Sequence, residues 1–181
     1  MDRRKFIRNS VLGAGAVALT GGGIWFGRQA AKERLTLDAA LNQLDRFAHN
    51  GAISQGAWNA AQVFTHCAQS IEYSIAGYPE HKSELFKQTV GPVAFGLFAA
   101  RGKMRHDLGE PIPGAPLLDP QQDAQQALAR LHQALVEFDR HSGPFAPHFA
   151  YGDMTKEDYR LAHLMHLNNH FEELELAFVD V

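Results

Sequence analysis

Apolar residues recur at helical spacing in four long stretches of the chain, and polar positions fill the opposite faces. This periodicity is typical of amphipathic helices that pack one face against a common core. The stretches cover residues 36–49, from 54 or 56 to about 76, from 119 or 123 to about 141, and 158–178. They predict four long helices.

Capping residues support the ends of these helices. Thr36 is a candidate N-cap for the first, and Asn50-Gly51 follows its last turn. Thr155 precedes the fourth helix with Asp158 three residues later, which is the spacing of a capping box.

A less regular region separates the second and third predicted helices. Residues 81–103 favour helix with a break at Gly91-Pro92, and residues 104–120 hold so many glycines and prolines that they exclude a regular element. A second irregular segment, residues 142–154, is rich in aromatic residues. No stretch alternates convincingly with period two. The pattern therefore predicts an all-α domain, a four-helix bundle with a partly helical insertion between the second and third long helices.

Three histidines of the fourth helix form a stripe. At about 100° per residue, His163, His166 and His170 fall within about 60° of one another. An apolar stripe runs beside them, made of Leu164, Leu167, Phe171, Leu174 and Phe178. Two interpretations stay open for this pattern: a metal site between helices, or histidines at the core edge that bond to neighbours.

One histidine, His66, lies midway along the second helix, away from its apolar stripe. It shares a polar face with Gln62, Ser70 and Tyr73, which is either a solvated surface or one wall of a polar pocket. This helix by itself favours solvent. Its neighbour Cys67 lies on the apolar stripe, which indicates packing rather than nucleophilic chemistry.

Composition narrows the class of protein. The 181 residues, 45% of them hydrophobic, suffice for one domain with a full core. Residues 1–34 carry seven basic and two acidic residues, so the remaining ten basic and 18 acidic residues give the rest of the chain a formal charge of about −8. That charge argues against nucleic acid as a partner. The single cysteine excludes an internal disulfide.

The N-terminus has the layout of a targeting segment. A basic start containing Arg3, Arg4 and Phe6 precedes an apolar stretch over residues 11–26, and it resembles a twin-arginine export signal. We therefore expect residues 1–34 to direct export of the protein by the twin-arginine translocase, to the periplasm or the periplasmic face of the inner membrane. No clear cleavage site follows, so an uncleaved membrane anchor is the alternative to a removed signal.

Four short motifs together carry a family resemblance. These are residues 65–72 (Thr-His-Cys-Ala-Gln-Ser-Ile-Glu), 111–116 (Pro-Ile-Pro-Gly-Ala-Pro), 147–152 (Pro-His-Phe-Ala-Tyr-Gly) and 166–170 (His-Leu-Asn-Asn-His). In their order and spacing, residues 35–181 resemble the DinB-like superfamily of metal-binding bundles, and within it an uncharacterised branch, the domain of unknown function 1569 proteins.

The resemblance implies a divalent metal bound by His66, His166 and His170. Three imidazoles suit zinc best, with nickel or iron as alternatives, and they leave a coordination position open. The polar face of His66 would then line a pocket. The residues that would surround the metal or face a substrate are Gln62, Ser70, Tyr73, His106, His148, Tyr151 and His163.

The reaction is less well defined than the site. Some related bundles transfer low-molecular-weight thiols, whereas this branch has no established activity. We expect a metal-dependent hydrolase or transferase acting on a small molecule, or alternatively a non-catalytic metal- or ligand-binding accessory protein of the cell envelope; a homodimer is compatible with either. A di-iron carboxylate site is excluded because no Glu-x-x-His motif occurs. A serine hydrolase is unsupported because the Gly-x-Ser-x-Gly motif is absent.

Overall fold

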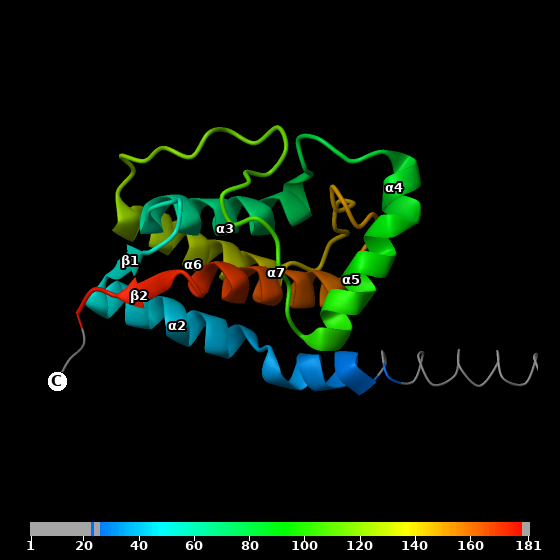
Figure 1. The fold of residues 1–181 in the computed structure, drawn as a ribbon, viewed down its shortest axis with the longest axis horizontal. Helices are drawn as coiled ribbons and strands as arrows, with labels where there is room; N and C mark the ends of the chain where they lie inside the picture. The colour runs from blue at the N-terminus through cyan, green and yellow to red at the C-terminus, as the bar shows by residue number, and fades with distance from the viewer. Residues whose placement is uncertain (1–22, 24–25, 179–181) are drawn as a thin grey trace, which may run out of the picture.

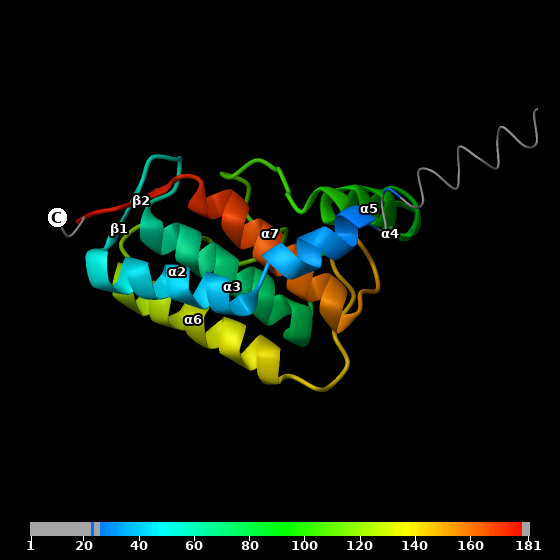
Figure 2. The same ribbon diagram turned by 90° about the horizontal axis from the view of Figure 1, so that it is seen from below.

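Four long helices form the body of the molecule in the computed structural model, which describes residue 23 and residues 26–178. They are α2 (Leu37–Asn50), α3 (Ala60–Ala76), α6 (Ala124–Arg140) and α7 (Lys156–Phe171). The helices lie side by side with α3 between α6 and α7 (Figures 1 and 2). The prediction of an all-α helical bundle is confirmed.

Helix α3 lies at the centre of the bundle. Twelve of its 17 residues are buried, and the polar residues Thr65, His66, Gln69, Ser70 and Ser74 are among them. A helix in this position is covered on nearly every side, so a polar row on it faces the interior rather than solvent. The expectation of a solvated face, drawn from α3 alone, is therefore wrong for His66, whose exposed fraction is 3%.

The predicted caps are observed. The Thr36 side chain accepts a hydrogen bond from the Ala39 amide, and Thr155 and Asp158 form the expected capping box at the start of α7. Helix α3 begins later than predicted, at Ala60, because Asn59 and Gln62 form another capping box there.

The insertion between α3 and α6 contains two helices, α4 (Glu84–Gln88) and α5 (Val90–Arg101), followed by the irregular segment 102–123. Helix α5 packs closely on the segment between α6 and α7: a Cβ at Gly91 would collide with the carbonyl oxygen of Ala150. Helix α5 and the segment between α6 and α7 therefore lie over the same end of α3 and α7 (Figure 1).

The fourth helix is shorter than predicted. It ends at Phe171, and strand β2 (Leu174–Leu176) pairs antiparallel with strand β1 (Ala52–Ser54). The predicted continuation of the helix to Phe178 is wrong, because residues 174–176 form a short strand in a molecule that is mostly helical. Each strand has three residues, too few to show a period-two pattern, and the backbone pairing that defines them is made only in the folded chain.

Residues 26–34 are helical and pack against the bundle. Arg28 forms an ion pair with Asp158, and Arg160 donates a hydrogen bond to the carbonyl of Leu35. The predicted export residues Arg3, Arg4 and Phe6 lie outside the described residues. Within the described part of the chain, none of the helices has the length and apolar character needed to cross a bilayer.

Candidate metal centre

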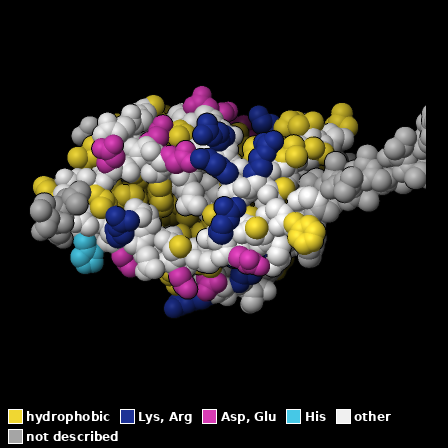
Figure 3. Space-filling model, turned by 60° about the horizontal axis from the view of Figure 1, so that its bottom comes forward, with side chains coloured by type: hydrophobic (Ala, Val, Ile, Leu, Met, Phe, Trp, Pro, Cys, Tyr) yellow, Lys and Arg dark blue, Asp and Glu magenta, His cyan; other side chains and the backbone are white. Residues whose placement is uncertain are grey.

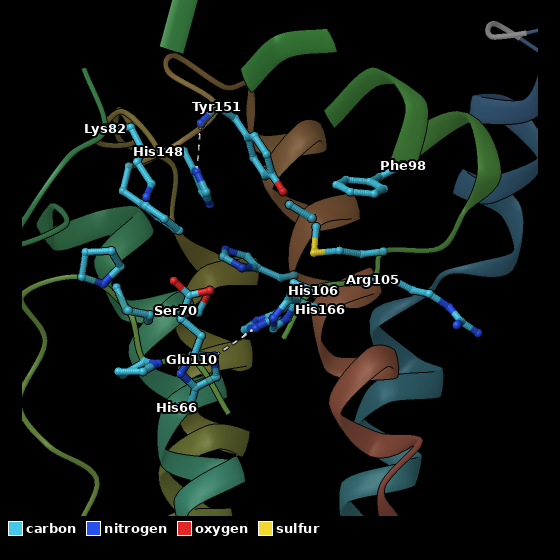
Figure 4. A pocket seen from close by; sticks show the side chains of 17 residues that line it. His66, Ser70, Lys82, Phe98, Arg105, His106, Glu110, His148, Tyr151 and His166 are labelled. Atoms are coloured by element: carbon cyan, nitrogen blue, oxygen red, sulfur yellow. Dashed lines mark hydrogen bonds between the residues drawn. The ribbon is translucent and has the colours of Figure 1, made fainter. Parts of the chain in front are cut away.

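Three histidines from two helices converge inside the bundle. His66 comes from the middle of α3, and His166 and His170 lie one turn apart on α7. The Nε2 atom of His166 is 3.1 Å from Nε2 of His66 and 3.1 Å from Nε2 of His170. One nitrogen from each of the three rings lies within 4.8 Å of the others. Figure 4 shows His66 and His166 meeting below the pocket.

These separations fit one divalent cation. Nitrogens that bind a metal at about 2.0–2.1 Å are about 2.8–3.4 Å apart at octahedral or tetrahedral angles. Hydrogen bonding alone accounts less well for the cluster. A neutral imidazole nitrogen carries either one proton or one lone pair, so Nε2 of His166 cannot make a well-directed bond to both partners. The donor set therefore suits a cation.

Burial keeps these rings uncharged. Desolvation, with a smaller contribution from His106, lowers the pKa of His66 to about 3. Desolvation and the charges of His66 and His106 lower the pKa of His170 to about 2, and burial holds the pKa of His166 well below its usual value. Neutral imidazole is the form that binds a metal.

Aromatic packing sets the orientation of the rings. Trp58 stacks on His170 with an interplanar angle of 7° and lies 4.9 Å from His66, centroid to centroid. The Nδ1 atoms of His66 and His170 are buried and find no hydrogen-bond partner among the described residues. The acceptor that usually orients a metal-bound imidazole is thus replaced here by packing against an indole.

A fourth imidazole, His106, approaches from the irregular segment that follows α5. Its ring centroid is 5.0 Å from that of His166 and 5.1 Å from that of His170. The Nδ1 atom lies 2.8 Å from the carbonyl oxygen of Asp107. Because a carbonyl only accepts, Nδ1 carries the proton and Nε2 of the neutral ring keeps its lone pair.

A cavity of about 220 Å³ opens above this cluster, and Figure 4 shows its lining side chains. Its floor contains His66 and His166, and Phe98 and Met104 form part of an apolar wall. The complete lining is His66, Ser70, Lys82, Phe98, Met104, Arg105, His106, Glu110, Pro111, Ile112, Pro113, His148, Phe149, Tyr151, Ala162, His163 and His166. The site therefore combines a candidate cation position with room for a small molecule.

The wall opposite the floor presents two hydrogen-bond donors. Nδ1 of His148 accepts from the backbone amides of Ala150 and Tyr151, both at 3.1 Å, which leaves the proton of the neutral ring on Nε2. Desolvation, together with the nearby His163 and His81, lowers the pKa of His148 to about 3. Burial raises the pKa of Tyr151 to about 12. Both groups point into the cavity and remain uncharged donors (Figure 4).

The remaining predicted site residues divide into two groups. His163 and Ser70 line the cavity, and His163 is packed between Phe138 and Tyr159. Gln62 and Tyr73 are not among its lining residues. Gln62 takes part in the capping box of α3 and donates to the carbonyl of Leu118, and the Tyr73 ring packs on Tyr78.

Two residues that line the cavity, Glu110 and Lys82, could not be identified as site residues from the sequence pattern. Glu110 lies in the glycine- and proline-rich segment, where no periodicity assigns a direction to a side chain, and its carboxylate faces the cavity (Figure 4). Trp58 also contacts two of the histidines, and this contact depends on the path of the loop that leads into α3.

The fold and the site together define a helical-bundle protein with a three-histidine group in its interior. The chain belongs to the family described as "Protein of unknown function (DUF1569)", whose model matches residues 31–176. No curated protein and no solved structure gives a significant match.

Proposed function

We propose that this protein is a metal-dependent enzyme whose divalent cation is held by His66, His166 and His170. This proposal rests on the convergence of three imidazole nitrogens, from buried His66 and His170 and half-buried His166, beside a cavity that His66 and His166 line. Zinc suits such a ligand set best, and nickel or iron are the alternatives. The resemblance to DinB-like bundles points to the same three residues.

The surrounding side chains favour hydrolysis or group transfer on a small molecule. A divalent cation with an open coordination position supplies Lewis-acid chemistry and makes a water or thiol ligand more acidic. Glu110 offers a carboxylate that can accept a proton in the cavity, while Nε2–H of His148 and the Tyr151 hydroxyl donate to an oxygen of the substrate. Phe98 and Met104 provide apolar contact for its body.

Metal analysis tests the site directly. The wild-type protein should carry about one divalent ion per chain when purified without chelators, and the double variant His66→Ala/His170→Ala should lose it. His49→Ala is the matched control, because His49 is exposed on α2. Equal metal content in wild type and the double variant would contradict the proposal.

Turnover distinguishes an enzyme from an accessory protein. Metal-loaded wild type should release product from at least one member of a panel of esters, amides and thiol-transfer substrates, and His166→Ala should be inactive. Stoichiometric metal without turnover on the whole panel would favour the non-catalytic binding function.

We also propose that the protein is exported, on the basis of the basic and apolar sequence of residues 1–34. Replacing Arg3 and Arg4 by Lys should retain a fused reporter in the cytoplasm. Export of the reporter unchanged by both substitutions would overturn the twin-arginine assignment.

A further inference from the structure

Helices α4 and α5 carry a stripe of large apolar side chains that the bundle does not cover. The exposed fractions are 74% for Leu85, 54% for Val90, 64% for Val93 and 43% for Leu97. The opposite side of α5 is buried through Gly91, Phe95 and Ala99. We call the four exposed residues and their surroundings the α4–α5 face.

The same segment is basic in an otherwise acidic domain. Residues 82–105 contain five Lys or Arg and one Glu, whereas the rest of residues 35–181 contains five basic and 17 acidic residues. Four of these basic residues, Lys82, Arg101, Lys103 and Arg105, are exposed, whereas Lys87 is buried and forms an ion pair with Glu84. Exposed positive charge of the domain is thus concentrated in the segment that carries the apolar stripe. In Figure 3, Lys and Arg side chains adjoin apolar ones at the end of the molecule that holds this segment.

The N-terminal helical stretch meets the bundle at this end. Gly27 packs so closely on α5 that a Cβ would collide with the carbonyl oxygen of Ala100, and the Arg28 guanidinium lies 5.6 Å from the Phe95 ring centroid. Residues 11–26 of the sequence are predominantly apolar. The described helical stretch that begins at residue 26 therefore lies against α5 (Figures 1 and 2).

We propose that the α4–α5 face docks on the surface of an anionic lipid bilayer, with its apolar side chains in the interfacial region and its basic side chains toward lipid headgroups. Basic residues that flank an apolar helix face are the combination that binds such surfaces. The contact is peripheral, because both helices are too short to span a bilayer.

A second copy of the chain is a less suitable occupant. A two-fold interface uses the same patch on both copies, so it would bring the exposed basic residues of one copy close to those of the other. A bilayer with anionic headgroups complements this charge. The docking surface is also separate from the three-histidine group, so it does not depend on metal binding.

Site-specific labelling tests this contact in the full-length chain. Cys67 is completely buried, so a new cysteine at Val93 can be labelled selectively with an environment-sensitive nitrobenzoxadiazole dye. Leu117→Cys is the matched control, since Leu117 is 92% exposed and lies outside α4 and α5. On vesicles containing phosphatidylglycerol, the dye at position 93 should shift to the blue and be quenched by doxyl-labelled lipid, and the dye at 117 should do neither.

Position-specific labels separate this contact from membrane attachment by the N-terminal segment alone. An unchanged spectrum at position 93 in protein that sediments with the vesicles would overturn the proposal. So would an equal shift on uncharged phosphatidylcholine vesicles, or a shift that appears with protein concentration and without lipid, which would identify self-association. Arg101→Glu should weaken the shift on anionic vesicles, because it reverses one of the five positive charges. The metal content of the labelled proteins should stay at the wild-type level.

Discussion

His106 is the residue whose role depends most on its neighbours. It belongs to an irregular segment and is exposed, yet its ring lies about as close to His166 and His170 as those two rings lie to each other, at 4.7 Å. Its Nδ1 atom is occupied by the Asp107 carbonyl. Nε2 is therefore the ring nitrogen with which His106 can support the proposed cation at the three-histidine group.

We expect the His106→Ala variant to bind zinc about tenfold more weakly than wild type, because groups that adjoin metal ligands typically contribute this much to affinity. The variant should still bind one ion per chain at saturation. The loss should be smaller than for His166→Ala. Competition with a chelating dye measures both affinities, and His49→Ala provides the reference for an exposed histidine. An affinity equal to wild type would place His106 outside the surroundings of the ion.

Helix α5 connects the cavity to the outer surface of the molecule. Its inner side contacts the segment that carries His148 and Tyr151, both through the close approach at Gly91 and through Phe95, whose ring centroid is 5.5 Å from that of Tyr151. Phe98 contributes to the cavity wall. The packing of one short helix thus positions the donors that face the three-histidine group.

Two glycines of α5 provide a matched test of this packing. Gly91→Ala should destabilise the protein by about 1–3 kcal/mol, because the new Cβ would displace the backbone at Ala150. Gly96→Ala should stabilise it by up to about 1 kcal/mol, since no described atom lies within 4 Å of its Cβ position and Ala favours helix. Urea unfolding measures both, and equal effects would show that α5 does not pack as described.

Buried neutral histidines link the stability of the whole molecule to pH. Burial lowers the pKa of His66, His148 and His163 to about 3, that of His170 to about 2, and that of His166 well below its usual value. In the unfolded chain these groups titrate near 6.5. Between these values the unfolded state binds more protons than the folded state, so acidification favours unfolding.

We therefore expect the free energy of unfolding of chelator-treated protein to fall as the pH decreases from about 7.5 to about 5.5, by on the order of 1 kcal/mol for each such histidine. His163→Phe should reduce the pH dependence of the free energy of unfolding by the contribution of one histidine. We choose Phe because His163 is packed between two aromatic rings. The comparison variant is His49→Gln, because His49 is exposed on α2. Urea unfolding at the two pH values provides the measurement, and identical free energies would contradict the expectation.

The sequence by itself determined the helical bundle and placed His163, His166 and His170 on one side of the last long helix. Both follow from local periodicity: apolar residues every three to four positions define the helices, and two histidines four residues apart lie on the same side of one helix. The caps at Thr36 and Thr155 are local for the same reason. The family resemblance then selected His66, His166 and His170 as the expected metal ligands.

Only the tertiary structure decided which polar groups surround the three histidines. Glu110, His106 and His148 lie in segments without periodicity, so their directions depend on packing between segments distant in the chain. The same holds for the end of α7, where pairing of β2 with β1 replaces the last predicted helical turns. Contacts of this kind depend on backbone positions that local patterns do not contain, whereas helix periodicity is set within a few residues.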